Sequence, residues 1–231
     1  MGDRYTITVE AEALKERFNA EVPGRYEPRY NAAPTQVLPV ITQGSKGLSF
    51  FYWGQIPGRS KNRAISPKLL FIEKETLTEK LSFREALLKN RCLIPADGYY
   101  DWKKISKKGK VPHRFIFGNN AVMSFAGIWE EFEDDEENIV HTFRIITTPS
   151  NRLMASINDR MPAVLTREAE KAWLDIHTPE EELIESLKTY PPDKMGLYTV
   201  SPRISDLNNE GPSLVRPMAP ADQFGNYSLF D

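Results

Sequence analysis

The stretch that decides the fold is RCLIPADGYYDWKKI, residues 91–105. Its first half is apolar, and its second half mixes aromatic and polar side chains, a pattern typical of strands in a sheet. Three more strand-like stretches follow, at residues 113–118, 121–132 and 140–148. Because strands and helices do not alternate regularly, the pattern favours an α+β fold with curved antiparallel sheets over a doubly wound parallel sheet.

On the N-terminal side of this stretch, the sequence predicts further strands at residues 4–9, 37–42 and 47–56. A short helix should follow the first strand, with Ala13, Leu14 and Phe18 on its apolar side. A second helix is expected over residues 78–90; its predicted core side is Leu81, Ala86 and Leu88, and its N-cap Thr78 or Ser82. The polar and basic stretch 57–68 shows no periodicity and is expected to be an exposed loop.

On the C-terminal side, residues 166–176 and 179–190 have the spacing of helices, and 197–207 form a last strand and turn. The tail from about residue 217 is expected to be extended. A chain of 231 residues that is rich in strands is commonly one unit, so the sequence favours a single domain over residues 1–231.

Composition narrows the class of protein. The chain is 40% hydrophobic and 11% aromatic, which indicates a globular protein with a real core. Its net charge of −2 argues against general electrostatic binding of nucleic acid, so any such binding must come from a local patch. Lysines cluster at residues 103–110 and acidic residues at 130–137; both runs are interpreted as solvated hairpin ends. The alternative for the basic run is a patch that attracts phosphate, which the acidic run would repel.

The single cysteine, Cys92, cannot form an internal disulfide and lies in an apolar run, so we expect a buried, inert thiol in a reducing compartment. No segment has the length of a membrane span or the pattern of a secretory leader, so a cytoplasmic location is expected, nucleoid-associated if the protein binds DNA. The three histidines lack the spacing of metal ligands, and no glycine-rich phosphate loop is present. We therefore expect neither a metal nor a cofactor.

Two segments carry candidate chemistry. In residues 95–102, Asp101 lies among aromatic side chains, where a carboxyl can have a raised pKa and act as an acid or base. The alternative is a strand residue that faces solvent. In residues 157–165, Asn158 and Arg160 precede an apolar strand; the alternative there is an Asx turn with a surface ion pair.

These two segments, taken with their neighbours, resemble the SRAP family of SOS response-associated peptidases, also described as abasic-site processing proteins. The resemblance runs nearly end to end, through RYTIT, RYNAAPTQVLPVI, YWGQIP, SFAGIWE, TFRIITTPSNRLMASINDRMPAVL and TVSPRISDLNNEGP. It implies one domain of barrel-like, mainly antiparallel sheets with flanking helices and a cleft for single-stranded DNA. It also implies that a cysteine at position 2, exposed by removal of the initiator Met, forms a thiazolidine crosslink with the aldehyde of an abasic site.

The positions to which the resemblance assigns catalytic roles carry other residues in this chain. The family's cysteine, asparagine, glutamate and histidine are replaced by Gly2, Phe71, Asp101 and Asn158. Gly2 has no thiol, and an asparagine cannot exchange protons near neutral pH as a histidine can.

Neighbouring positions also differ from the family pattern. A family glycine is Asp3, a family arginine is Glu73, and Arg59 and Ser60 stand in a loop that usually carries a tryptophan. The positions expected to contact DNA are kept: Arg4, Pro34, Trp102, Thr147 and Arg160.

Three hypotheses follow. The first is an inactive SRAP-fold protein with weakened or altered binding of single-stranded or abasic DNA, indicated by the joint loss at Gly2, Phe71 and Asn158. The second is an enzyme that uses the α-amine of Gly2 to form an imine with abasic DNA, with Asp101 as the acid–base group. The third is a protein-interaction module without a DNA role, suggested by the acidic run and by Glu73.

Overall fold

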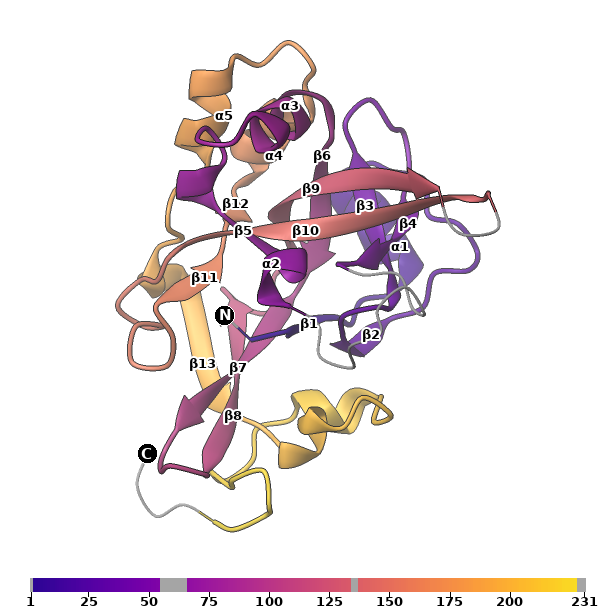
Figure 1. Ribbon diagram of the computed structural model, residues 1–231. Coiled ribbons are helices and arrows are strands. Elements are labelled where there is room, and N and C mark those ends of the chain that lie inside the picture. The colour runs from indigo at the N-terminus through magenta and orange to yellow at the C-terminus, as the bar shows by residue number, and fades with distance from the viewer. Residues whose placement is uncertain (1, 55–65, 134–136, 228–231) are drawn as a thin grey trace.

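The computed structural model describes residues 2–54, 66–133 and 137–227, which form two sheets with short helices around them (Figure 1). The larger sheet contains β3 (Val37–Thr42), β4 (Ser49–Trp53), β5 (Phe71–Glu73), β6 (Arg91–Ala96), β9 (Met123–Glu133), β10 (Ile139–Pro149), β11 (Arg160–Pro162) and β12 (Val164–Leu165). The smaller sheet has the order β13 (Met195–Thr199), β8 (Lys110–Phe117), β7 (Gly98–Lys104), β1 (Arg4–Ile7) and β2 (Arg29–Ala32).

The larger sheet closes on itself. Its strands run in the order β10, β4, β3, β6 and β9, and β9 then pairs with β10 to complete a barrel. The strand β10 is parallel to β4 and β5, whereas the other pairings in this sheet are antiparallel. The expected α+β class with curved, mainly antiparallel, barrel-like sheets is confirmed.

A glycine lies at the seam of the barrel. Gly127 of β9 pairs with Cys92 of β6 on one side and with Ile145 of β10 on the other. A Cβ at this position would lie 2.2 Å from Cδ1 of Ile94 and 3.1 Å from the carbonyl oxygen of Arg144. The missing side chain therefore lets the two neighbouring strands approach β9 closely.

The smaller sheet packs against the barrel through aromatic side chains. Tyr5 of β1 contacts Trp53 of β4 edge to face at 5.3 Å between ring centroids, and it contacts Phe125 of β9 at 6.0 Å. Tyr5 pairs with Tyr99 across β1 and β7, and both are fully buried. This packing fixes β1 beside β7 and so determines where the N-terminal residues lie.

Five α-helices and four 3₁₀ helices lie in the described residues. The α-helices are α1 (Ala11–Phe18), α2 (Pro67–Leu70), α3 (Leu81–Lys89), α4 (Arg167–Leu174) and α5 (Glu180–Ser186). The 3₁₀ helices are η1 (Lys74–Thr76), η2 (Pro192–Lys194), η3 (Pro202–Ser205) and η4 (Pro212–Val215). Among these helices, none has the length and apolar character needed to cross a membrane.

The predicted core side of α3 is partly wrong. Ala86 is buried as expected, but Leu81 is 73% exposed and Leu88 is 40% exposed, while Leu87 is fully buried. The side of α3 that meets the barrel is formed by Phe83, Ala86 and Leu87, at spacing i, i+3 and i+4, so Leu81 and Leu88 lie outside it. The N-cap residue of the helix is Lys80, which makes no side-chain cap, so the predicted caps Thr78 and Ser82 are also wrong.

Other boundaries differ in detail. In α1, Leu14 is buried but Ala13 is exposed, because only one row of this short helix faces the core. Most of the predicted loop 57–68 lies outside the described residues, but its end, Pro67 and Lys68, belongs to α2. After η4, the described tail contains only an isolated bridge between Ala221 and Tyr227, while the single-domain boundary stays a prediction.

Candidate functional site

One cleft brings together the four positions that the sequence singled out for chemistry. Gly2, Phe71, Asp101 and Asn158 all line a cleft of about 570 Å³. They come from the segment before β1, from β5, from β7 and from the turn before β11, and Figure 1 shows the N-terminus in the space between these strands. Four segments far apart in the sequence therefore form one site.

Asp101 lies at the centre of the hydrogen bonds in this cleft. Its Oδ2 accepts from the backbone N–H of Gly2 at 2.6 Å and from Nδ2 of Asn158 at 3.1 Å, and its Oδ1 accepts from the N–H of Trp102 at 2.8 Å. The residue is only 4% exposed, so the alternative of a strand residue that faces solvent is wrong.

Burial raises the pKa of the Asp101 carboxyl, and the positive charge of the N-terminus together with the hydrogen bonds from the Trp102 and Gly2 backbones and from Asn158 offsets only part of this rise. A carboxyl in this state holds its proton to higher pH than an exposed aspartate does. Asp101 is therefore suited to exchange a proton with a group bound in the cleft.

Neighbouring atoms closely surround Gly2. A Cβ on this residue would lie 2.3 Å from the carbonyl oxygen of Tyr100 and 3.1 Å from a ring carbon of Trp102. Because the nearest atom belongs to the backbone of β7, a larger residue requires the N-terminal segment or the strand to move. The packing around Gly2 therefore leaves no space for a side chain in the present arrangement.

Asn158 combines the two interpretations that the sequence left open. Its Nδ2 donates to Asp101 in the cleft, and its Oδ1 accepts from the backbone N–H of Arg160 at 3.2 Å, as in an Asx turn. The surface ion pair is also present, between Arg160 and Glu75 at 2.9 Å. The turn therefore holds the amide in place to contact the carboxylate.

Phe71 contributes an apolar wall. Its ring meets Trp53 edge to face, with 5.9 Å between centroids, and its backbone pairs with Ile145 of β10. A phenyl ring offers no hydrogen bond to a bound sugar.

Similarity to known proteins identifies the family of this chain. The family model described as SOS response associated peptidase (SRAP) matches residues 1–207. The chain belongs to the SRAP family. It is 39% identical over 221 residues to the abasic site processing protein YoqW of Bacillus subtilis, a match that covers 93% of this chain and 99% of the relative.

More distant SRAP relatives are found among eukaryotes. The chain is 29% identical over 242 residues to the abasic site processing protein HMCES of Rattus norvegicus, covering 87% of this chain and 67% of that protein. Among solved structures, a crystal structure of a protein from Bacteroides thetaiotaomicron superposes with a TM-score of 0.81 at 26% identity, covering 94% of this chain and all of the other.

Of the five SRAP positions expected to contact DNA, only Trp102 lines the cleft of this chain, where its Nε1 donates to the Ser205 hydroxyl at 3.3 Å. Pro34 is buried in the turn between β2 and β3. Thr147 is buried in β10 and accepts from Arg160. The roles in DNA binding stay predictions.

The two arginines expected to contact DNA are engaged within the protein. Arg4 is 8% exposed, and its Nη1 lies 2.8 Å from Oδ1 of its neighbour Asp3. Arg160 pairs with Glu75 and donates to the carbonyl oxygen of Thr147 at 2.6 Å. Each guanidinium is therefore already neutralised by a carboxylate.

Several further residues line the cleft, and of these only the two lysines were expected to contribute to DNA binding. They are Asp3, Pro67, Leu70, Lys104, Lys110, Ser156 and Ile157. The two lysines belong to the basic run that the sequence showed, and Ser156 and Ile157 directly precede Asn158. Their place in the cleft could not be read from the sequence, since it depends on the pairing of β7 with β8 and on the turn before β11.

The single cysteine lies away from this chemistry. Cys92 is fully buried in β6, where burial raises the pKa of its thiol. In the described ranges, no group of three His, Cys, Asp or Glu side chains could hold a metal ion. Residues Arg59 and Ser60, and 134–136 of the acidic run, lie outside the described residues.

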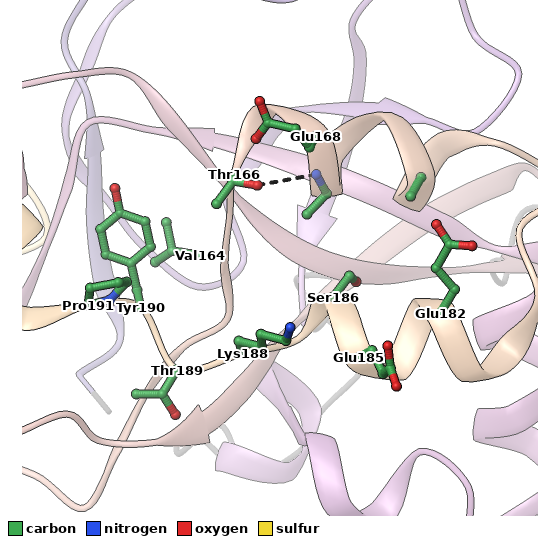
Figure 2. A pocket seen from close by; sticks show the side chains of 12 residues that line it. Val164, Thr166, Glu168, Glu182, Glu185, Ser186, Lys188, Thr189, Tyr190 and Pro191 are labelled. Carbon is green, nitrogen blue, oxygen red and sulfur yellow. Dashed lines mark hydrogen bonds between the residues drawn. The ribbon is translucent and has the colours of Figure 1, made fainter.

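A second pocket, shown in Figure 2, lies between α4 and α5. It has a volume of about 420 Å³ and shares no lining residue with the cleft. Glu168, Glu182, Glu185 and Lys188 are among its polar residues, and Thr166 caps α4 there by accepting from the N–H of Ala169 at 3.3 Å.

Proposed function

We propose that this SRAP chain recognises abasic sites in single-stranded DNA but forms no thiazolidine crosslink with them. One observation carries the proposal: the nucleophile position holds Gly2, and the carbonyl of Tyr100 occupies the space that a side chain would need. A thiazolidine requires an amine and a thiol on adjacent carbons of one residue. The only thiol of the chain, that of Cys92, is buried in the barrel.

Recognition of the abasic site is supported by the relatives and by the cleft. YoqW and HMCES are named abasic site processing proteins, and one of them aligns with almost this whole chain. The cleft offers a buried carboxyl, an amide and a partly exposed indole to a sugar that lacks its base.

A binding experiment tests this proposal. Labelled single-stranded oligonucleotides, identical except for one abasic site, are titrated with protein at low salt, and fluorescence anisotropy is measured. We expect tighter binding of the abasic strand and a steep loss of affinity with salt. Equal affinity for the abasic strand and the intact strand would contradict the proposal that the protein recognises abasic sites. If the protein binds neither strand, the hypothesis of a protein-interaction module is favoured.

A second candidate function is imine formation, and the short contact between Gly2 and Asp101 favours it. If Met1 is removed, the Gly2 nitrogen, which lies 2.6 Å from Oδ2 of Asp101, becomes an α-amine next to that carboxyl. The amine would add to the aldehyde to form a carbinolamine; Asp101 would then protonate the departing hydroxyl, releasing water and leaving the C=N bond.

Borohydride separates the two candidates, because it reduces an imine to a stable amine. The protein is incubated with abasic single-stranded DNA with and without borohydride, and its intact mass shows whether Met1 is absent. An adduct that requires both borohydride and a free Gly2 amine supports imine formation. If the protein lacks Met1 and still gives no trapped adduct, the second candidate is wrong.

A further inference from the structure

The positively charged side chains around the cleft differ in whether they already form an ion pair within the protein. Arg4 and Arg160 are each paired with a carboxylate, at 2.8 Å and 2.9 Å. A DNA phosphate would have to displace Asp3 or Glu75 to reach them, and a phosphate that replaces a carboxylate adds no net charge attraction. These two arginines are therefore poorly placed to provide the electrostatic part of DNA binding.

The β7–β8 hairpin carries lysines that, unlike these two arginines, form no ion pair in the described residues. Lys104, Lys107, Lys108 and Lys110 are all exposed, and within the part of the chain that the structure describes no carboxylate pairs with any of them. These four residues are called the hairpin lysines below. Their charges are available to an incoming anion.

The register of the hairpin directs two of these lysines toward the cleft. Lys104 and Lys110 lie opposite each other in the β7–β8 ladder, so their side chains share one face, and both line the cleft. Trp102 precedes Lys104 by two residues on the same strand and therefore lies on the same face, about 7 Å away along the strand. An aromatic ring next to unpaired cations is the arrangement that binds single strands without regard to sequence.

The hairpin is also held in a defined position. Its end is closed by a hydrogen bond from the N–H of Ile105 to the carbonyl of Gly109 at 3.0 Å. Gln223 from the C-terminal tail supports it from outside: its Oε1 accepts from the N–H of Lys110 at 2.7 Å, and its Nε2 donates to the carbonyl of Lys108. The hairpin lysines therefore lie on an element that hydrogen bonds hold in position.

We propose that the hairpin lysines bind the phosphodiester backbone of the single strand whose abasic site enters the cleft, in place of Arg4 and Arg160. The inference rests on the proposed function and adds the surface that carries the electrostatic part of binding. Lys104 and Lys110 contact the phosphates nearest the cleft, and Lys107 and Lys108 contact the strand beyond it. The chain as a whole has a net charge of −2, so it provides no general attraction for phosphate beyond such a local patch.

The test compares two pairs of charge-removing substitutions. Lys104→Gln with Lys110→Gln changes the hairpin, and Lys89→Gln with Lys171→Gln removes the same charge from exposed positions on α3 and α4. Affinity for an abasic single strand is measured by anisotropy over a range of salt concentrations. For the hairpin pair we expect a slope of log affinity against log salt that is reduced by about 1.4, at roughly 0.7 for each lost contact.

The control pair should keep the slope of the unmodified protein, and Lys104→Arg with Lys110→Arg should keep both slope and affinity. Thermal unfolding of each variant checks that exposed substitutions leave the fold intact. An unchanged slope in the hairpin pair overturns this inference alone. Absence of any binding by the unmodified protein overturns the proposed function and the inference with it.

Discussion

Gly2 decides which chemistry is open to the N-terminus. It has no thiol, and the backbone of β7 occupies the space beside it, so restoring a cysteine does not by itself restore the site. We compare Gly2→Cys with a combined variant that adds Asp3→Gly, Phe71→Asn, Glu73→Arg, Asp101→Glu and Asn158→His. The single variant should crosslink abasic DNA at least ~100-fold more slowly, because acid–base groups alone contribute factors of this size to a rate. Denaturing gels of labelled abasic DNA over time measure both rates.

A second glycine provides the steric control for this prediction. A Cβ at Gly24 would meet no atom within 4 Å, whereas one at Gly2 meets the Tyr100 carbonyl. Gly24→Ala should leave the contact network of the cleft intact, and Gly2→Ala should break the hydrogen bond from the Gly2 N–H to Asp101. Fast crosslinking by Gly2→Cys alone would show that the N-terminal segment moves aside easily and that the steric argument is wrong.

Asp101 gives a prediction about pH. Its pKa is raised in the folded state, so its contribution to stability is fully present below the ordinary aspartate pKa of about 3.9 and is lost as the pH rises through the raised value. The melting temperature of Asp101→Asn relative to the unmodified protein should therefore increase from about pH 3.5 toward neutral pH. Thermal melts across this range measure the difference.

Asp159→Asn is the matched control for this pH profile, because Asp159 is exposed on the same turn as Asn158. Its melting temperature relative to the unmodified protein should change little over the same range. A flat or falling profile for Asp101→Asn would mean that the carboxyl is not held at a raised pKa.

At the scale of elements, a buried arginine joins the ends of two helices. The Arg91 side chain of β6 is 1% exposed and donates to the carbonyls of Leu87 and Leu88 in α3. It also donates to the carbonyls of Trp173 in α4 and of Asp175 just after it. These carbonyls lie at helix C-termini, where a cation is favourable.

We expect Arg91→Met to lower the free energy of unfolding by roughly 2–4 kcal/mol, because it leaves buried carbonyls without their charged donor. Urea unfolding measures the change, and Lys89→Met, at an exposed position on α3, should stay close to the unmodified protein. A loss no larger than that of Lys89→Met would show that water replaces the guanidinium.

The sequence predicted the strands better than the helices. Residues 91–104 and 110–149 are long, apolar and strongly patterned, and the structure has strands over most of them. The predicted core side of α3 was wrong because a helix of nine residues offers more than one set of apolar positions at helical spacing, and the set that meets the core is Phe83, Ala86 and Leu87. Periodicity is a weak guide when an element makes so few turns.

At the scale of the whole molecule, periodicity could not show the closed barrel or the cleft. Closure depends on β10 pairing with β4, and the cleft depends on Gly2 lying next to Asp101, 99 positions along the chain. Local patterns carry no information about such distant pairs; the resemblance to the SRAP family supplied the expectation. The pairing of Arg4 with Asp3 was not expected, and the ion pair considered for the Asn158–Arg160 segment could not be given its partner, Glu75, because both depend on side-chain geometry.

The central claim is that this SRAP protein has lost thiazolidine chemistry while keeping the fold around the site. The measurement that tests it most directly is incubation of the unmodified protein with labelled abasic single-stranded DNA without borohydride, followed by heating and a denaturing gel. The account predicts that all labelled DNA migrates free of protein. A heat-stable protein–DNA adduct formed under these conditions would contradict it.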